Sequence, residues 1–136
     1  MEGVGRGSGG AAFRSYRDLR VWQDAMALAE RCYQVTSTYP KEEMYGLTAQ
    51  TRRSAVSIAA NISERHGRES TGAFVQFLRN AQGSLKELET HLLLAGRVEC
   101  TSPLETEPLL MKCDELGRML RSLIRSLQRN KGEAKE

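Results

Sequence analysis

The chain has 136 residues, of which 40% are hydrophobic, 27% charged and 6% aromatic, and its formal net charge is +3. These values are typical of one soluble globular domain and leave no room for a second core. The longest run without a charged residue spans 54–63, well short of the roughly 18 to 20 apolar residues that cross a bilayer. Because no signal segment stands at the start, we expect a cytoplasmic protein.

The N-terminal segment contains little that could form a core. Residues 1–12 hold five of the twelve glycines and few large apolar side chains, so we expect residues 1–15 to be disordered. From residue 16 onward apolar residues recur every three or four positions, and this period predicts an all-α fold. The first helix is expected over 16–37, before Pro40. Its core stripe is predicted to be Leu19, Trp22, Met26, Ala29 and Tyr33.

The first helix has a second apolar stripe, nearly opposite the first. Its members are Val21, Leu28, Cys32, Val35 and Tyr39. One helix cannot point two opposite stripes into the same core, and large exposed apolar faces are uncommon on monomers. We therefore expect the second stripe to be a homo-oligomer interface, with coverage by loops or by the N-terminal arm as the alternative.

The second and third helices have one main apolar stripe each. The second is expected over 42–66, with Gly67 as the residue that ends it. The third is expected from about Ser70, a favourable N-cap, to about Glu99. Their stripes comprise, in order, Met44, Leu47, Ala55, Ile58 and Ile62, then Phe74, Phe77, Ala81, Leu85, Leu88, Leu92 and Ala95.

The fourth helix completes the predicted domain. Ser102 and Glu105 have the spacing of a capping box around Pro103, although Pro108 leaves a later start at Thr106 open. The helix is expected to end near residue 130, before a charged tail over 131–136. Its stripe comprises Leu109, Cys113, Leu116, Leu120, Leu123 and Leu127. Four long amphipathic helices with short connections predict an antiparallel, up-down-up-down four-helix bundle over 16–130.

The residue types needed for catalysis or metal binding are scarce. His66 and His91 are the two histidines, and Cys32, Cys100 and Cys113 form no CxxC pair. This pattern predicts neither a metal site nor a disulfide framework. No phosphate-binding glycine loop follows a strand pattern. We therefore expect a protein that is not an enzyme and has no cofactor.

Arginines give the clearest polar pattern. Arg118, Arg121, Arg125 and Arg129 are spaced three, four and four apart, opposite the leucines of the fourth helix. The spacing is compatible with a stripe that contacts phosphates, but by itself it favours a solvated helix face, which is the more common case. Arg52 and Arg53 form a second basic group on the second helix. Several polar residues in the middle of that helix, including Ser54, Ser57 and Asn61, either face a neighbouring subunit or form an internal hydrogen-bond network, and we favour the structural network.

Four ordered blocks of the sequence resemble a known family. They are Tyr16–Gln23, Tyr45–Gln50 with Arg52–Ile58, Asn61–Glu64, and Gly83–Glu89. These blocks resemble the four-helix-bundle proteins encoded in intervening sequences of 23S ribosomal RNA genes, which are similar to the accessory variability determinant of diversity-generating retroelements. The resemblance implies a closed homo-oligomeric ring, a homopentamer, and partners that include RNA or DNA and a polymerase-type protein such as a reverse transcriptase. The sequence departs from the family pattern after Glu64, where Arg65 and His66 precede Gly67.

Together these patterns favour a homo-oligomeric accessory or scaffold protein that binds RNA or DNA through Arg52, Arg53 and the four arginines of the fourth helix. Repetition of such a basic surface around a ring would raise its effective concentration. The alternative is a protein-interaction module, without direct nucleic-acid binding, whose arginines meet an acidic protein surface.

Overall fold

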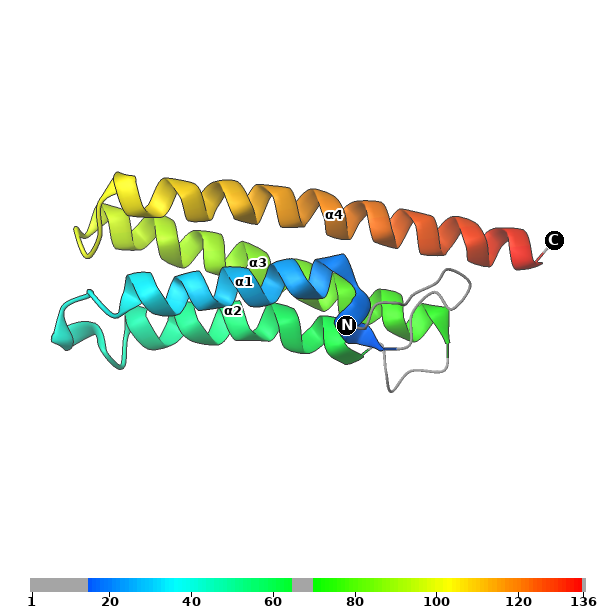
Figure 1. The fold of residues 1–136 in the computed structure, drawn as a ribbon, viewed down its shortest axis with the longest axis horizontal. Coiled ribbons are helices and arrows are strands. Elements are labelled where there is room, and N and C mark those ends of the chain that lie inside the picture. The colour runs from blue at the N-terminus through cyan, green and yellow to red at the C-terminus, as the bar shows by residue number, and fades with distance from the viewer. Residues whose placement is uncertain (1–14, 65–69, 136) are drawn as a thin grey trace, which may run out of the picture.

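A computed structural model describes residues 15–64 and 70–135, with the side chains given up to residue 130 (Figure 1). It contains four α-helices: α1 (Arg20–Thr36), α2 (Leu47–Ser63), α3 (Thr71–Arg97) and α4 (Pro103–Lys135). Two short 3-10 turns, η3 (Tyr16–Asp18) and η4 (Lys41–Glu43), precede α1 and α2. No strand occurs within these residues, so the predicted all-α class is confirmed. The predicted disordered segment lies almost entirely outside the described part of the chain.

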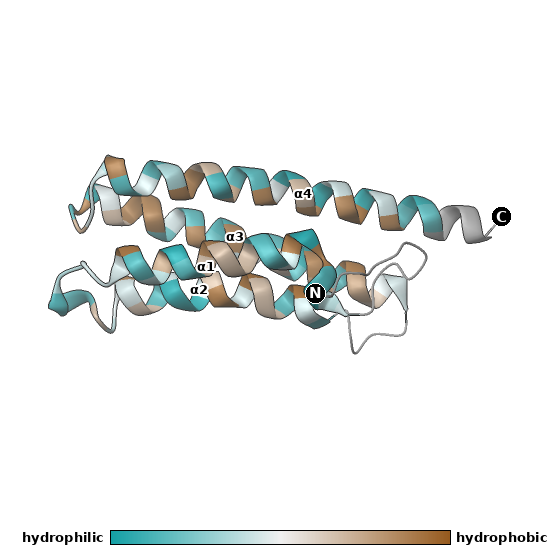
Figure 2. Cartoon of the chain, in the orientation of Figure 1, coloured by the Kyte–Doolittle hydropathy of each residue, from teal (hydrophilic) through white to brown (hydrophobic). Residues whose placement is uncertain are grey.

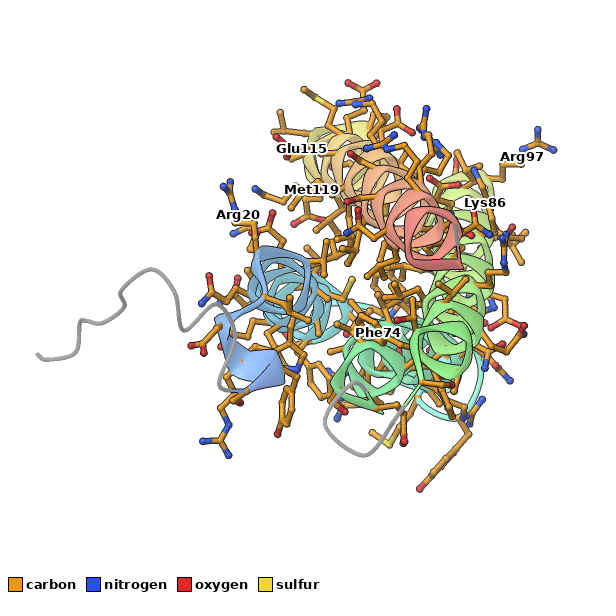
Figure 3. All side chains as sticks on the ribbon, turned by 90° about the vertical axis from the view of Figure 1, so that its right-hand side faces the viewer. Arg20, Phe74, Lys86, Arg97, Glu115 and Met119 are labelled. Carbon is orange, nitrogen blue, oxygen red and sulfur yellow. The ribbon has the colours of Figure 1, made fainter. Side chains whose placement is uncertain are left out.

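The helices form an up-down-up-down bundle. Each helix packs against its neighbour in sequence, and α4 closes the arrangement by packing against α1, whereas α2 and α4 lie diagonally across the core. In the view down the bundle, Arg20 on α1 and Lys86 on α3 therefore lie on opposite sides (Figure 3). Hydrophobic and hydrophilic bands alternate along every helix (Figure 2), as expected when each helix buries one stripe.

The core confirms most of the predicted stripes. All of the predicted α3 stripe is buried except Phe77, which is half-buried, and Leu109, Cys113, Leu116 and Leu120 of α4 are fully buried. In α2 the stripe is buried from Ala55 onward, whereas Met44 is exposed. Ile124 is a further buried residue that the regular leucine spacing missed.

The assignment of the two α1 stripes was wrong in part. Leu19 and Ala29 of the predicted core stripe are buried as expected, and Trp22 is half-buried. Val21, Leu28, Cys32, Val35 and Tyr39, the predicted oligomer interface, are buried in the core of the chain itself. Met26 and Tyr33, predicted to be core, are 39% and 46% exposed. At about 100° per residue the two stripes are separated by roughly 120°, not 180°, so one faces the core and the other borders α2. Tyr and Trp also favour such borders, because their polar atoms stay near water.

The first two helices begin later than predicted because local caps interrupt them. The Ser15 hydroxyl accepts a hydrogen bond from the Arg17 amide at 3.0 Å, and extended Leu19 then separates this turn from α1. The Glu43 carboxylate accepts from the Leu47 amide at 2.9 Å and so starts α2. A Cβ on Gly46 would lie 2.6 Å from the same Glu43 oxygen, so a larger residue there would displace the Glu43 carboxylate from this cap. Gly67 lies outside the described residues.

The ends of α3 and α4 mostly follow the sequence signals. The Ser70 hydroxyl accepts from the Ala73 amide at 3.1 Å, which confirms the predicted N-cap. Glu99, which follows the Val98 C-cap of α3, adopts a left-handed conformation with φ of 63°. The fourth helix starts at Pro103 and not at Thr106. It continues to Lys135, five residues into the predicted tail.

The predicted polar network joins α2 to α3. The hydroxyl groups of Ser57 and Ser84 lie 2.8 Å apart, and the Ser54 hydroxyl lies 3.2 Å from Nδ1 of His91. The Asn61 amide donates to the Ser57 carbonyl at 2.9 Å. Hydrogen bonds between facing helices are geometrically specific, so this seam fixes the register of α2 against α3.

Candidate nucleic-acid interface

The four arginines of α4 form a basic ridge on its outer face. Arg118, Arg121, Arg125 and Arg129 are all exposed, and at about 1.5 Å per residue they extend over roughly 16 Å. None of the four makes an ion pair with another described residue. Their guanidinium groups are therefore available to an external anion. We call these four residues the arginine ridge.

The arginine ridge borders a hollow between α3 and α4. Arg118 and Arg121 line it together with Lys86 of α3, and its volume is about 400 Å³. Gly117 contributes no side chain there: a Cβ at this position would lie 3.5 Å from Leu85 and 3.6 Å from the Arg121 guanidinium. Lys86 forms an exposed ion pair with Glu89 at 3.2 Å. Lys86 was not predicted as part of the basic surface, because its proximity to α4 depends on the packing of α3.

Arg52 lies elsewhere and already has partners. Its Nε donates to the Thr36 hydroxyl at 2.9 Å, and its guanidinium stacks 4.5 Å from the centre of the Tyr33 ring. These contacts tie α2 to the C-terminal turn of α1. Arg53 is exposed and donates to the Gln50 side chain at 2.8 Å. Since α2 and α4 are diagonal, the predicted set of six arginines does not form one surface.

An apolar groove lies on the outer side of α1 and α2. Trp22, Met26 and Tyr33 of α1 and Val56 of α2 form its walls, small residues including Ala59 line it, and its volume is about 750 Å³. Tyr16 packs edge-on against Trp22, with ring centroids 5.4 Å apart. We call this surface the α1–α2 groove. The sequence indicated a second apolar face on α1 but not which of the two stripes formed it.

The cysteines are placed as buried apolar residues. Burial raises the pKa of the Cys32 and Cys113 thiols to about 12, so both remain protonated at neutral pH. Burial also raises the pKa of half-buried Cys100, to which nearby Glu43 contributes. A thiol that resists ionisation is a poor nucleophile and metal ligand. None of the three cysteine thiols is therefore activated as a nucleophile.

The described residues contain no group of three His, Cys, Asp or Glu side chains that could hold a metal ion. Within the same part of the chain, no helix has the length and apolar character needed to cross a membrane.

The fold and its outer faces define a helical-bundle protein with a basic ridge on one helix and an apolar groove between two others. Residues 17–122, most of the chain, match the family described as 23S rRNA-intervening sequence protein. The chain belongs to this family, as the resemblance of its sequence blocks predicted.

A solved structure is similar to this one over most of both chains. It is the crystal structure of a protein of unknown function from the S23 ribosomal protein family of Bacteroides thetaiotaomicron, with 26% sequence identity and a TM-score of 0.72. The match covers 77% of this chain and 95% of the other. No curated protein matches this sequence.

Proposed function

We propose that the protein is a non-enzymatic, homo-oligomeric scaffold that binds RNA or DNA phosphates through the arginine ridge. The observation that carries this proposal is the row of four exposed guanidinium groups without an internal ion-pair partner. Arginine suits this role because its planar fork donates two hydrogen bonds to one phosphate. Lys86, beside Arg118 and Arg121, extends the basic surface onto α3.

Self-association is the second part of the proposal, and the α1–α2 groove supports it. An open apolar surface with half-exposed Met26 and Tyr33 favours burial against another protein surface. The family resemblance favours a closed ring of five copies. Four arginines on one subunit would bind weakly, but repetition around a ring raises the effective concentration of every ridge.

The test compares two variants of equal charge. In the first, all four residues of the arginine ridge become Gln. In the matched control, Arg31, Arg53, Arg79 and Arg97, which are exposed on the other three helices, become Gln. Binding of labelled RNA and DNA is measured from low to high salt. Each lost phosphate contact lowers the slope of log affinity against log salt by about one, so the ridge variant should lose about three to four units.

The control variant should keep most of the wild-type slope, because its arginines are dispersed over the other helices. Equal losses in both variants would mean that net charge, and not the arginine ridge, governs binding. Binding that is unchanged in the ridge variant would overturn the proposal.

A protein partner is the second candidate, favoured by the same α1–α2 groove. Here the arginine ridge would meet an acidic surface, for example on a polymerase, and the apolar groove would supply the buried contact. Capture from lysate with and without nuclease separates the two candidates. A specific partner that survives nuclease and is lost in the ridge variant favours the protein partner.

A further inference from the structure

A second exposed apolar surface lies on the opposite side of the bundle from the α1–α2 groove. Leu93 of α3 and Met111 of α4 are 56% and 71% exposed, and they lie together around a shallow depression with Leu110. The carboxylates of Glu89, Glu107 and Asp114 line the same depression. We call this surface the α3–α4 patch.

The order of the helices places the two surfaces on opposite edges. Because α1 packs on α2 and α4, and α3 on α2 and α4, the α1–α2 edge and the α3–α4 edge face away from each other. Figure 3 shows this arrangement: α1 and α3, with Arg20 and Lys86, lie on opposite sides of the core. One surface is hollow and the other carries protruding, flexible Leu and Met side chains.

The charges of the two surfaces are complementary at matching heights. Both the α1–α2 and α3–α4 connections lie at the same end of the bundle (Figure 1). Counting inward from that end, the α1–α2 side presents Arg52, which stacks on Tyr33 at the edge of the groove, and then Glu30, which lines the groove. The opposite side presents Glu107 of α4 and Glu89 of α3. Lys86 follows less than one turn beyond Glu89, with which it forms an ion pair, and Arg118 follows about three turns beyond Glu107. Along the bundle axis, one surface therefore presents a positive and then a negative charge, and the other presents negative and then positive charges.

We infer that the α3–α4 patch of one copy docks into the α1–α2 groove of the next copy, with Leu93 and Met111 seated between Met26 and Val56. This inference rests on the proposed self-association and specifies its geometry. Two different surfaces meet, so the contact is heterologous and repeats from copy to copy until a ring closes. Arg118 lies at the edge of the contact, whereas Arg125 and Arg129, the part of the arginine ridge farther along α4, stay outside it and are repeated with the assembly.

The test uses two double variants that each disable one surface. The groove variant is Met26→Glu with Val56→Glu, and the patch variant is Leu93→Glu with Met111→Glu. All four side chains are at least 39% exposed, so the bundle should fold, and circular dichroism and urea unfolding verify this. Met44→Glu with Leu94→Glu changes exposed apolar residues outside both surfaces and is the matched control. Solution mass is measured by light scattering on a sizing column.

Wild type and control are expected to be oligomers and each surface variant a monomer. The decisive sample is an equimolar mixture of the two variants. One intact groove and one intact patch remain, whereas the two disabled surfaces repel each other through added carboxylates. The mixture should therefore form a 1:1 dimer and nothing larger, detectable at twice the monomer mass.

Other outcomes overturn specific statements. If the patch variant alone keeps the wild-type mass, the groove binds another groove or a different surface, and the heterologous contact is wrong while self-association stands. If the mixture stays monomeric although both variants are folded, the pairing is also wrong. If wild type is a monomer at all concentrations, the proposed self-association itself fails, and the groove serves another protein.

Discussion

The outer faces of α1 and α4 differ although both helices give the core one apolar stripe. Leu28 and Cys32 of α1 and Leu116 and Leu120 of α4 are equally buried. Away from the core, α1 presents Met26 and Tyr33 in an apolar groove, whereas α4 presents the arginine ridge. The same architecture thus carries one surface suited to burial and one suited to remain in water.

This difference explains why the sequence predicted the buried face of α4 correctly but not that of α1. In α4 the leucines have arginines opposite them, so only one face can be buried. In α1 both stripes are apolar, and burial of either would satisfy the pattern. The packing of α2 against α1, which is a contact distant in sequence, decides between them.

Core truncation on α1 should have the largest effect and separates the two stripes directly. Leu28→Ala leaves a cavity in the core and should lower the free energy of unfolding by about 2–5 kcal/mol. Met26→Ala, on the exposed stripe, should lower it by less than about 1 kcal/mol. Urea unfolding followed by circular dichroism measures both.

Equal losses in the two variants would contradict the orientation of α1. A loss at Met26 that grows with protein concentration would have a different meaning, because it would reflect the contribution of the α1–α2 groove to self-association.

The outcome of the other predictions also depended on whether the contacts involved are local or distant in sequence. The Ser70 cap and the Pro103 start depend on neighbours in sequence. The cap was predicted, and Pro103 was one of the two starts that the sequence left open. The contacts of Arg52 are made with Thr36 and Tyr33, sixteen and nineteen residues away. Because these contacts are not visible in the sequence, the basic charge of Arg52 alone suggested a binding residue. The arginine ridge was predicted as a face, but the presence of Lys86 beside it required the packed structure.

The thiols of α1 and α4 predict a loss of stability at high pH. Cys32 and Cys113 ionise near their ordinary pKa of 9.0 when unfolded but only near 12 when folded. Above pH ~9 the unfolded state therefore releases protons that the folded state retains, and unfolding is favoured by roughly 1 kcal/mol per thiol and pH unit. Below pH ~9 both states hold these protons, so the contribution does not vary.

Urea midpoints at about pH 8, 9 and 10 test this sign. The double variant Cys32→Ala with Cys113→Ala should be less stable at pH ~8, because it loses packing, yet less sensitive to pH above ~9. A pH dependence identical to that of wild type would show that other groups cause the alkaline loss. Tyr39, whose pKa burial also raises to about 12, should contribute only above pH ~10.

Arg52 provides a smaller test of the junction between α1 and α2. Arg52→Met keeps much of the apolar stem but removes the donor to Thr36 and the stacked guanidinium, so stability should fall by about 1 kcal/mol. Arg53→Met, at the exposed neighbouring position, should change stability by less than about 0.5 kcal/mol. If binding of RNA or DNA falls in the Arg53 variant as strongly as in a ridge variant, the separation of the two basic groups is wrong.

The smallest effect on stability is expected at Arg125, on the outer face of α4. It has no ion-pair partner among the described residues, so Arg125→Gln should leave the unfolding free energy within about 0.5 kcal/mol of wild type. Its effect should be confined to binding, where the slope of log affinity against log salt falls by about one. A residue whose removal changes binding and not folding is what distinguishes a phosphate contact from a solvated helix face, since the solvated face would change neither.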